Sequence, residues 1–564
     1  MGILRSSYVR WFCLTALLAL SFPGGIHTGQ AIASFGPATG SCTYHTYTVM
    51  APGDTGIQLD TTVRVPNNTT ACPKPAAGWP MIVSAHGFGG SKADMDNRAR
   101  TNASNGYIAV NASWRGHGNS TGTFTVLTQS EWNDLRSLTD WLLHTYTNTA
   151  TAVNPNRIGI DGVGLGSQIA WMALTQNMGY RDAVPGSFAG YAWDVMVPNN
   201  CVNNNINTFW LKPNVRLDPA IKQELWNDYL NLNTVQPLLD FFQSPDRNWS
   251  TSLNRLQGQV FAQGSWTDTY QFASAIIPTY ANDPVSPKRM YLASNGEEDF
   301  DKFSDVSTQN ETYRTQWHQR WLQDVQNGID QGDPVTYLGY LPGDPANPAN
   351  HTLVINTPAW PPAGVTSKTM YLDSHGSLAE SAPHQHNSSD ILTNTLLDPT
   401  YTITNAVYDE SPAFALTWTK IPTSSVTYTS PPLAQDVWWL GAPSVSYYTS
   451  ATGPNYNIVA LYYDLDPATG ARYLITRDQS CWHAGDPANR TVTGVPIARR
   501  LAAGHEIQVV FQNNDPETSR PRFIAQRIRP VFGNVTMTLY HESSRSTHTD
   551  LPLKPDQPSQ PIFR

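Results

Sequence analysis

One stretch of the sequence, Arg157 to Ala170, limits the possible folds more than any other. It reads Arg-Ile-Gly-Ile-Asp-Gly-Val-Gly-Leu-Gly-Ser-Gln-Ile-Ala, so closely spaced glycines separate two apolar segments. The first segment has the length of a buried strand, and clustered glycines allow a turn too tight for larger residues. The stretch therefore predicts a strand, a sharp turn and the start of a helix, as in an α/β protein.

The glycines have the spacing of a nucleophile elbow, in which Gly-x-Ser-x-Gly places a reactive serine on a strand-to-helix turn. Gly162 and Gly166 stand at the flanking positions, but Gly164 stands where the serine belongs. Ser167 does not fit as a substitute, because the residues two before and two after it are bulky. The alternative interpretation is a glycine-rich turn of any α/β protein.

Periodicity predicts the elements around this turn. Strands are predicted at 41–66 (more than one), 79–85, 107–112, 260–264 and 289–293, and helices at 130–142 and 311–325. The helix at 130–142 has apolar side chains at a 3.6-residue spacing. This order predicts a mostly parallel sheet with right-handed crossover connections.

With 564 residues, the chain is too long for a single core. We expect an α/β domain over 41–333, with helical runs at 192–255 forming a cap inserted over the carboxyl edge of the sheet. Short alternating runs between turn residues predict an antiparallel β-sandwich over 335–545. The Pro-rich segment 546–564 is expected to be a loose tail.

The N-terminus has the features of a secretory signal peptide over residues 1–33. Arg5 and Arg10 precede an apolar run from Trp11 to Phe22, and Ala31-Ile32-Ala33 offers a small-x-small cleavage site. The run is short of the roughly 20 apolar residues that a membrane span needs. We therefore expect a secreted, extracellular protein without a membrane span.

Four cysteines follow the predicted signal peptide, and an even number in an oxidising compartment predicts two disulfides. We favour Cys42 with Cys72, which leaves Cys201 with Cys481, although three connectivities are possible. The formal net charge is −9 and the pI is near 5.8. Without a basic stretch, nucleic acid is not an expected partner.

These features resemble the X-Pro dipeptidyl-peptidase and cocaine-esterase family of α/β-hydrolases. The resemblance rests on the elbow frame and on the segments 114–122, 264–269, 370–378 and 428–436. The last of these contains Thr-Ser-Pro-Pro-Leu, the most specific of the motifs. The resemblance implies a hydrolase domain with a helical cap, followed by a galactose-binding-like jelly roll.

The resemblance also implies a catalytic triad of serine, aspartate and histidine, in that order along the chain. The three positions match Gly164, Asp268 and Glu297, so only the aspartate is kept. Asp268 is alternatively a helix N-cap. Glu297 alternatively belongs to an exposed acidic loop, where a calcium site is only weakly indicated.

The run His86-Gly87-Phe88-Gly89-Gly90 follows a predicted strand and resembles the loop that supplies one oxyanion-hole amide. A plain glycine-rich turn explains this run equally well. If the resemblance holds, the backbone amides of Phe88 and Leu165 form the oxyanion hole. The only histidine between His144 and Gly328 is His318, which we interpret as a helix-face residue rather than a triad member.

Three functions remain open on the sequence alone. The first is a pseudoenzyme that binds a small ester or peptide-like ligand, with no cofactor and no metal site. The second is an active acyl or peptide hydrolase with a non-standard site. The third is a carbohydrate- or surface-binding protein, in which Trp438, Trp439 and Tyr447 of the sandwich stack on sugars.

Overall fold

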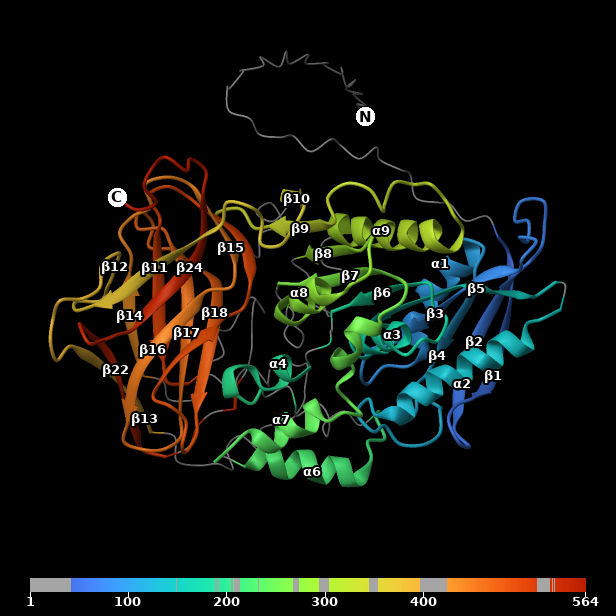
Figure 1. Ribbon diagram of the computed structural model, residues 1–564, viewed down its shortest axis with the longest axis horizontal. Helices are drawn as coiled ribbons and strands as arrows, with labels where there is room; N and C mark the ends of the chain where they lie inside the picture. The colour runs from blue at the N-terminus through green and yellow to red at the C-terminus, as the bar shows by residue number, and fades with distance from the viewer. Residues whose placement is uncertain are drawn as a thin grey trace, which may run out of the picture. The chain divides into compact units, whose positions relative to one another are not determined.

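The computed structural model of the chain contains two large sheets (Figure 1). It describes residues 42–148, 150–187, 190, 192–203, 206, 214–231, 233–266, 273–293, 304–343, 353–395, 424–514, 528–529, 531 and 533–564. The predicted signal peptide lies outside these residues. No helix in the described part of the chain has the length and hydropathy that crossing a membrane requires.

The first sheet has ten strands in the order β1-β2-β4-β3-β5-β6-β7-β8-β9-β10. They are β1 (Tyr44–Pro52), β2 (Gln58–Pro66), β3 (Trp79–Ala85), β4 (Ile108–Ala112), β5 (Val153–Val163), β6 (Asp182–Gly186), β7 (Gln259–Ser265), β8 (Arg289–Ala293), β9 (Val335–Gly339) and β10 (Leu353–Thr357). Strands β4, β3 and β5 to β9 run parallel, while β1, β2 and β10 are antiparallel to their neighbours. The carboxyl ends of seven strands therefore meet at one edge.

Helices cover both faces of this sheet (Figure 1). One face carries α1 (Asp96–Ser104) and α9 (Ser304–Leu322), and the other carries α2 (Gln129–Thr145), α3 (Leu165–Thr175) and α8 (Ala273–Asn282). A short 3-10 helix, η1 (Lys92–Met95), precedes α1. Helix α2 begins with a capping box, because Thr128 and Glu131 each bind a backbone amide of the first turn. The apolar spacing predicted this helix from the sequence, and the capping box fixes where it begins.

Helical pieces occupy the segment that was predicted to form a cap. They are α4 (Ala192–Met196), η2 (Pro198–Asn200), α6 (Pro219–Leu230), α7 (Gln236–Gln243) and η4 (Trp249–Arg255). Helix α7 buries Leu238, Phe241 and Phe242, and Leu239 packs partly buried against the same core. Because these pieces follow β6 and precede β7, the chain leaves and re-enters the sheet around them.

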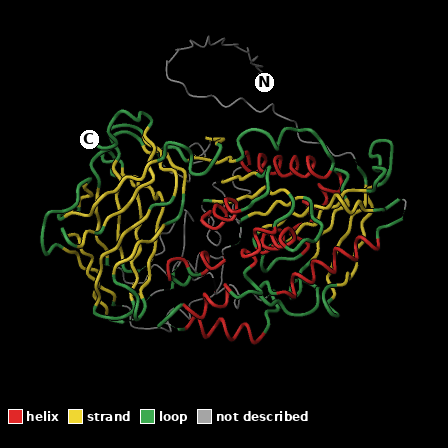
Figure 2. Tube along the Cα trace, viewed as in Figure 1, coloured by secondary structure: helices red, strands yellow, loops and turns green. Residues whose placement is uncertain are grey.

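The second sheet system is all-β and mostly antiparallel (Figure 2). Its strands are β11 (Thr366–Asp373), β12 (Ser377–Ala379), β13 (Ser389–Asn394), β14 (Ser425–Thr429), β15 (Val437–Gly441), β16 (Ser444–Ala451), β17 (Tyr456–Leu465), β18 (Arg472–Trp482), β19 (Asn489–Thr493), β20 (Ile497–Leu501), β21 (Glu506–Gln512), β22 (Val535–Glu542), β23 (Arg545–Ser546) and β24 (His548–Pro555). Strands β16 and β22 alternate buried and half-buried residues. This alternation is expected where one face of a strand packs in the core of a β-sandwich.

Four strands differ from the sequence-based prediction. Strands β9 and β10 fall inside the predicted sandwich, yet they extend the first sheet. Strand β24 falls inside the predicted loose tail, yet it pairs with β11, β15 and β16. Its prolines suggested a tail, but Leu551 and Leu553 are fully buried and hold it in the core. Strand β6 was not predicted, because it has only five residues and contains Pro185.

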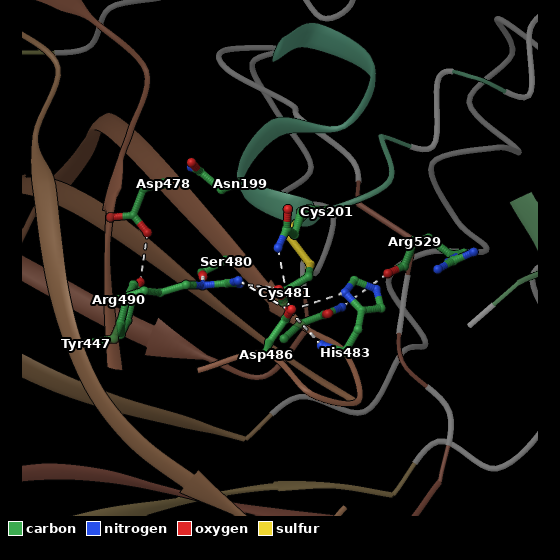
Figure 3. Close-up of a disulfide and its surroundings, with 12 residues drawn as sticks. Asn199, Cys201, Tyr447, Asp478, Ser480, Cys481, His483, Asp486, Arg490 and Arg529 are labelled. Carbon is green, nitrogen blue, oxygen red and sulfur yellow. Dashed lines mark hydrogen bonds and ion pairs between the residues drawn. A yellow bond between two sulfur atoms is a disulfide. The ribbon is translucent and has the colours of Figure 1, made fainter. Parts of the chain in front are cut away.

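Both preferred disulfides are present, Cys42–Cys72 and Cys201–Cys481. Figure 3 shows the second bond, which joins the end of η2 to β18 of the sandwich. Around it, the Asn199 side chain donates to the carbonyl of Thr493, and the Arg529 amide donates to the carbonyl of Val202. The cap segment and the sandwich are thus joined by a covalent bond and by hydrogen bonds from side chain and backbone.

A buried ionic cluster lies between the first sheet and α9. Arg314 donates to Asp161 of β5 at 2.8 Å, and His318 binds Asp182 of β6 at 2.8 Å. Burial disfavours a charged imidazole, but the carboxylates of Asp182 and Asp161 outweigh it and raise the pKa of His318. His318 is thus a buried residue of α9 that fastens the helix to the sheet, as expected for a helix residue outside the triad.

A second buried polar cluster lies in the sandwich core. The Asp478 carboxylate accepts hydrogen bonds from the hydroxyls of Tyr447 at 2.8 Å and Tyr462 at 3.1 Å. Burial raises the pKa of Asp478 to about 7. The two tyrosine hydroxyls compensate only part of the cost of burying this carboxylate.

Candidate functional site

The predicted elbow is a tight turn between β5 and α3. Gly164 is the N-cap of α3 and has φ 60° and ψ −116°, in the left-handed half of backbone space that favours glycine. Its amide donates to the carbonyl of Gly186 on β6, and its carbonyl accepts from the Ser167 amide. The turn is therefore held at the carboxyl edge of the sheet, where ligands bind in open α/β folds.

The flanking glycines are required by close backbone approach. A Cβ atom on Gly162 would lie 2.3 Å from the carbonyl oxygen of Gly166, and one on Gly166 would lie 2.0 Å from the carbonyl oxygen of Ala85. Real Cβ atoms essentially never come this close to another atom. The close packing of a nucleophile elbow is therefore kept, although the residue between the two glycines has no side chain.

No serine replaces the missing hydroxyl at this turn. Ser167 lies in the first turn of α3 and is fully buried, so its hydroxyl does not face a ligand. Gly164 itself offers only backbone atoms. Within the described residues, the turn therefore has no side-chain nucleophile at its apex.

The two amides predicted for an oxyanion hole come from neighbouring strands. Phe88 follows the carboxyl end of β3, and Leu165 follows the carboxyl end of β5. The two strands are hydrogen-bonded neighbours, with Ala85 opposite Gly162. The Phe88 ring is half-buried and packs 5.7 Å from the ring of His117. Both residues thus belong to the same edge of the sheet.

His86 holds the loop that carries Phe88. Burial lowers the pKa of His86 to about 4, so the ring is neutral at physiological pH. Its Nε2 accepts a hydrogen bond from the Trp114 amide at 3.1 Å. A neutral imidazole that accepts at Nε2 carries its proton at Nδ1, which donates to the carbonyl of Gly87 at 2.7 Å. His86 is therefore a structural link between two loops and not a titrating base.

The remaining predicted triad positions, Asp268 and Glu297, lie outside the described residues, as does the acidic run that was considered for calcium. They follow the carboxyl ends of β7 and β8 along the chain. In the part of the chain that the structure describes, no group of three His, Cys, Asp or Glu side chains has the arrangement of a metal site.

Two arginines without a predicted role form polar contacts next to this edge. Arg115 forms a bidentate ion pair with Asp134 of α2, and both side chains are buried. Arg216 of the cap segment donates to the backbone carbonyls of Gly118 at 3.1 Å and Gly122 at 3.4 Å, and also to Ser120. Arg216 therefore fastens the cap segment to the loop after β4.

Backbone contacts reinforce this attachment. Isolated bridges join His117 to Val215 and Phe124 to Leu217. The partners of Arg216 are carbonyl groups more than 90 positions away along the chain, so no sequence motif marks them. The cap segment is thus attached to the loop after β4 at the carboxyl edge. It is attached separately to the sandwich by the disulfide.

The aromatic residues proposed to stack on sugars do not form an exposed platform. Trp439 and Tyr447 are buried in the sandwich core, at 0% and 1% exposure. Trp438 is half-buried, and its ring stands 2.6 Å from the position that a Cβ on Gly339 would take. Gly339 belongs to β9, so Trp438 packs against the first sheet. These three residues serve packing and not sugar recognition.

Comparison with known families covers most of the chain. Residues 55–323 match the family described as X-Pro dipeptidyl-peptidase (S15 family), and residues 327–522 match the X-Pro dipeptidyl-peptidase C-terminal non-catalytic domain. No curated protein sequence matches this chain at a significant level.

Solved structures with the same fold are also known. An aminopeptidase from the marine sediment archaeon Thaumarchaeota archaeon has a TM-score of 0.65 at 14% identity, covering 92% of this chain and 98% of that chain. A CocE/NonD family hydrolase from Staphylococcus aureus has a TM-score of 0.68 at 12% identity, covering 90% and 94%. An alpha-amino acid ester hydrolase has a TM-score of 0.65 at 16% identity, covering 94% and 100%. At such identities the likeness shows the shared fold.

Proposed function

Because the chain belongs to the X-Pro dipeptidyl-peptidase and cocaine-esterase-like family of α/β-hydrolases, we propose that it is a secreted ligand-binding protein that has lost serine-based catalysis. The observation that carries the proposal is the geometry at Gly164. The turn, its flanking glycines and its place at the sheet edge are those of a nucleophile elbow. The position of the nucleophile is occupied by glycine, which has no side chain.

The magnitude of the expected loss supports this proposal. Removing the serine of a serine hydrolase typically lowers turnover by about a millionfold. What remains, roughly 10³–10⁴ over water, comes from binding and from the oxyanion hole. His86 offers no replacement base, because it is buried, neutral and committed to two backbone groups.

Retention of the surrounding scaffold supports a binding role. Arg216 and the Cys201–Cys481 disulfide hold the cap segment to the loop after β4 and to the sandwich. The amides of Phe88 and Leu165 need no serine to donate hydrogen bonds to a carbonyl oxygen. We propose a small ester or peptide-like molecule as ligand, because its carbonyl group suits such amides. The names of two similar proteins, an aminopeptidase and an ester hydrolase, agree with this chemistry.

Secretion is proposed because the N-terminus resembles a signal peptide and because the chain has two disulfides. Three of their four cysteines are buried. Expression of the full chain in a secreting host should release a protein that begins near Ser34. Intact-mass analysis of the released protein decides this point, and retention of residues 1–33 would contradict it.

A hydrolase screen of the purified mature protein tests the loss of catalysis. We expect no turnover of p-nitrophenyl esters or Xaa-Pro anilides above the buffer rate, and no labelling by a fluorophosphonate probe. Isothermal titration with unreactive amide analogues of the same compounds should still detect binding. Turnover that disappears in the Asp268→Ala variant would instead establish an active hydrolase with a non-standard site.

A further inference from the structure

A pocket lies at the edge of the first sheet opposite to Gly164. It has a volume of about 440 Å³, within the range of small-molecule sites. Residues at the amino ends of β8 and β9 line it, together with the end of α8 and the segment after β10. Because β5, β8 and β9 run parallel, the amino ends of β8 and β9 lie at the edge away from the elbow. The pocket is therefore separate from the proposed ligand site.

Its wall is largely apolar and aromatic. The apolar lining includes Ile277, Tyr280, Pro287, Met290, Val335 and Trp360. The Trp360 ring packs 4.9 Å from the ring of Trp266 and 5.1 Å from that of Tyr337, so it is held in place from two sides. Such a wall favours a flat apolar or aromatic body.

Two adjacent cations, Lys288 and Arg289, also line the pocket. The Lys288 ammonium donates to the backbone carbonyls of Tyr280, at 2.6 Å, and Asp283, and it lies 4.7 Å from the centre of the Tyr280 ring. An ammonium has three donors, so one has no hydrogen-bond partner in the part of the chain that the structure describes. Arg289 is buried and donates only to three carbonyl groups of the loop before β9. Its Nε has no partner among the described residues.

Carboxylates act on these two cations only through space, Asp283 on Lys288 and Asp333 and Asp330 on Arg289. Across the described ranges, no carboxylate lies within ion-pair distance of Lys288 or Arg289. Asp330 lines the pocket but is paired with Arg320 at 2.9 Å. Burial raises the pKa of Asp283 to about 6, so this carboxyl is still mostly ionised at pH 7, and burial lowers the pKa of Lys288 and of Arg289. Backbone carbonyls solvate these cations but do not neutralise them.

We infer that this pocket binds a small aromatic carboxylate, with its ring against Trp360 and Tyr280 and its anionic group on Lys288. A carboxylate would accept a hydrogen bond from the third N–H of Lys288 and would form the direct ion pair that this ammonium lacks among the described residues. The apolar wall would cover the ring. The site is independent of the proposed function, since it shares no residue with the carboxyl edge of the sheet.

Titration calorimetry with the full mature chain tests this inference. The probes are 2-naphthoate and its neutral isostere, naphthalene-2-carboxamide, at low ionic strength. We expect 2-naphthoate to bind at least about tenfold more tightly, because only the anion forms a charge-assisted hydrogen bond with Lys288. Equal affinities for the two probes, or no binding of 2-naphthoate at millimolar concentration, would overturn the inference.

Variants locate the binding to this pocket. Lys288→Met should weaken 2-naphthoate binding at least about tenfold, and Lys288→Arg should restore most of it. Because Lys288 also caps α8, a second variant leaves it in place: Ala281→Trp fills the pocket from an exposed position on its wall and should abolish binding. Lys368→Met removes a surface charge elsewhere and should have no effect. Undiminished binding in the Ala281→Trp variant would place the probe at another site.

Discussion

Gly166 at the start of α3 lies so close to Ala85 at the end of β3 that no side chain fits between them. A Cβ atom at position 166 would stand 2.0 Å from the Ala85 carbonyl oxygen. The clash is with backbone, which cannot rotate away as a flexible side chain does. This contact holds the elbow helix against the central strand.

Gly166→Ala should therefore destabilise the protein by about 3 kcal/mol or more, as overpacking of a rigid core does. Gly470→Ala is the matched control, because it has open space around it and only the cost of its φ of 71°. That cost should be about 1 kcal/mol. Urea unfolding of both variants measures the difference, and equal losses would show that the 166–85 contact relaxes easily.

Restoring catalysis requires two changes at once. Gly164→Ser alone supplies a hydroxyl without a base, and Glu297→His alone supplies a base without a nucleophile, so both single variants should stay inactive. The double variant, with Asp268 as its native third member, should hydrolyse p-nitrophenyl esters and label with a fluorophosphonate probe. Adding Asp268→Ala to it should remove that activity. Robust turnover by the unaltered protein that survives Asp268→Ala would refute the loss of catalysis.

Asp478 should make stability depend on pH. Its folded pKa is about 7 and its ordinary value is 3.8, so the folded state binds the proton more tightly than the unfolded state. Stability should rise as pH falls from about 7 towards about 4, by up to about 4 kcal/mol. Asp478→Asn removes this titration, so the difference in unfolding free energy between the native chain and the variant should change over that pH range. A difference that stays constant between pH 4 and pH 8 would contradict the raised pKa.

The two disulfides should differ in their effect on stability. The Cys201–Cys481 bond closes a sequence separation of 280, against 30 for Cys42–Cys72. In the chain-entropy description the longer loop contributes about 2 kcal/mol more. Replacing each pair by serines and measuring unfolding in urea tests this order. Peptide mapping without reduction checks the pairing itself, and a free thiol at any of the four positions would count against it.

Local signals carried most of the fold prediction. Helix α2 was predicted because its apolar residues recur at a 3.6-residue spacing. The β5–turn–α3 unit was predicted because glycine spacing reports backbone approach directly. Strand β6 was missed, since five residues around Pro185 give no periodicity. Strand β24 was missed, since proline content concealed the alternation of Leu551 and Leu553.

In the candidate site too, residues in local motifs were predicted and residues with long-range contacts were not. Gly164 was located from sequence because the elbow is a local motif. Arg216 was not found, because its partners are backbone carbonyls that any residue supplies. The pairing of His318 with Asp182 spans 136 positions and depends on which strand α9 covers. Such long-range pairs become visible only when the topology is known.

The Cys201–Cys481 bond imposes an order on biosynthesis. Its two cysteines are separated by 280 positions, and strands β7 to β17 lie between them in the sequence. While the ribosome makes that interval, Cys201 has no native partner, whereas Cys42 and Cys72 are both already available. Cys201 therefore stays without its native disulfide partner until the ribosome has synthesised β18, which carries Cys481.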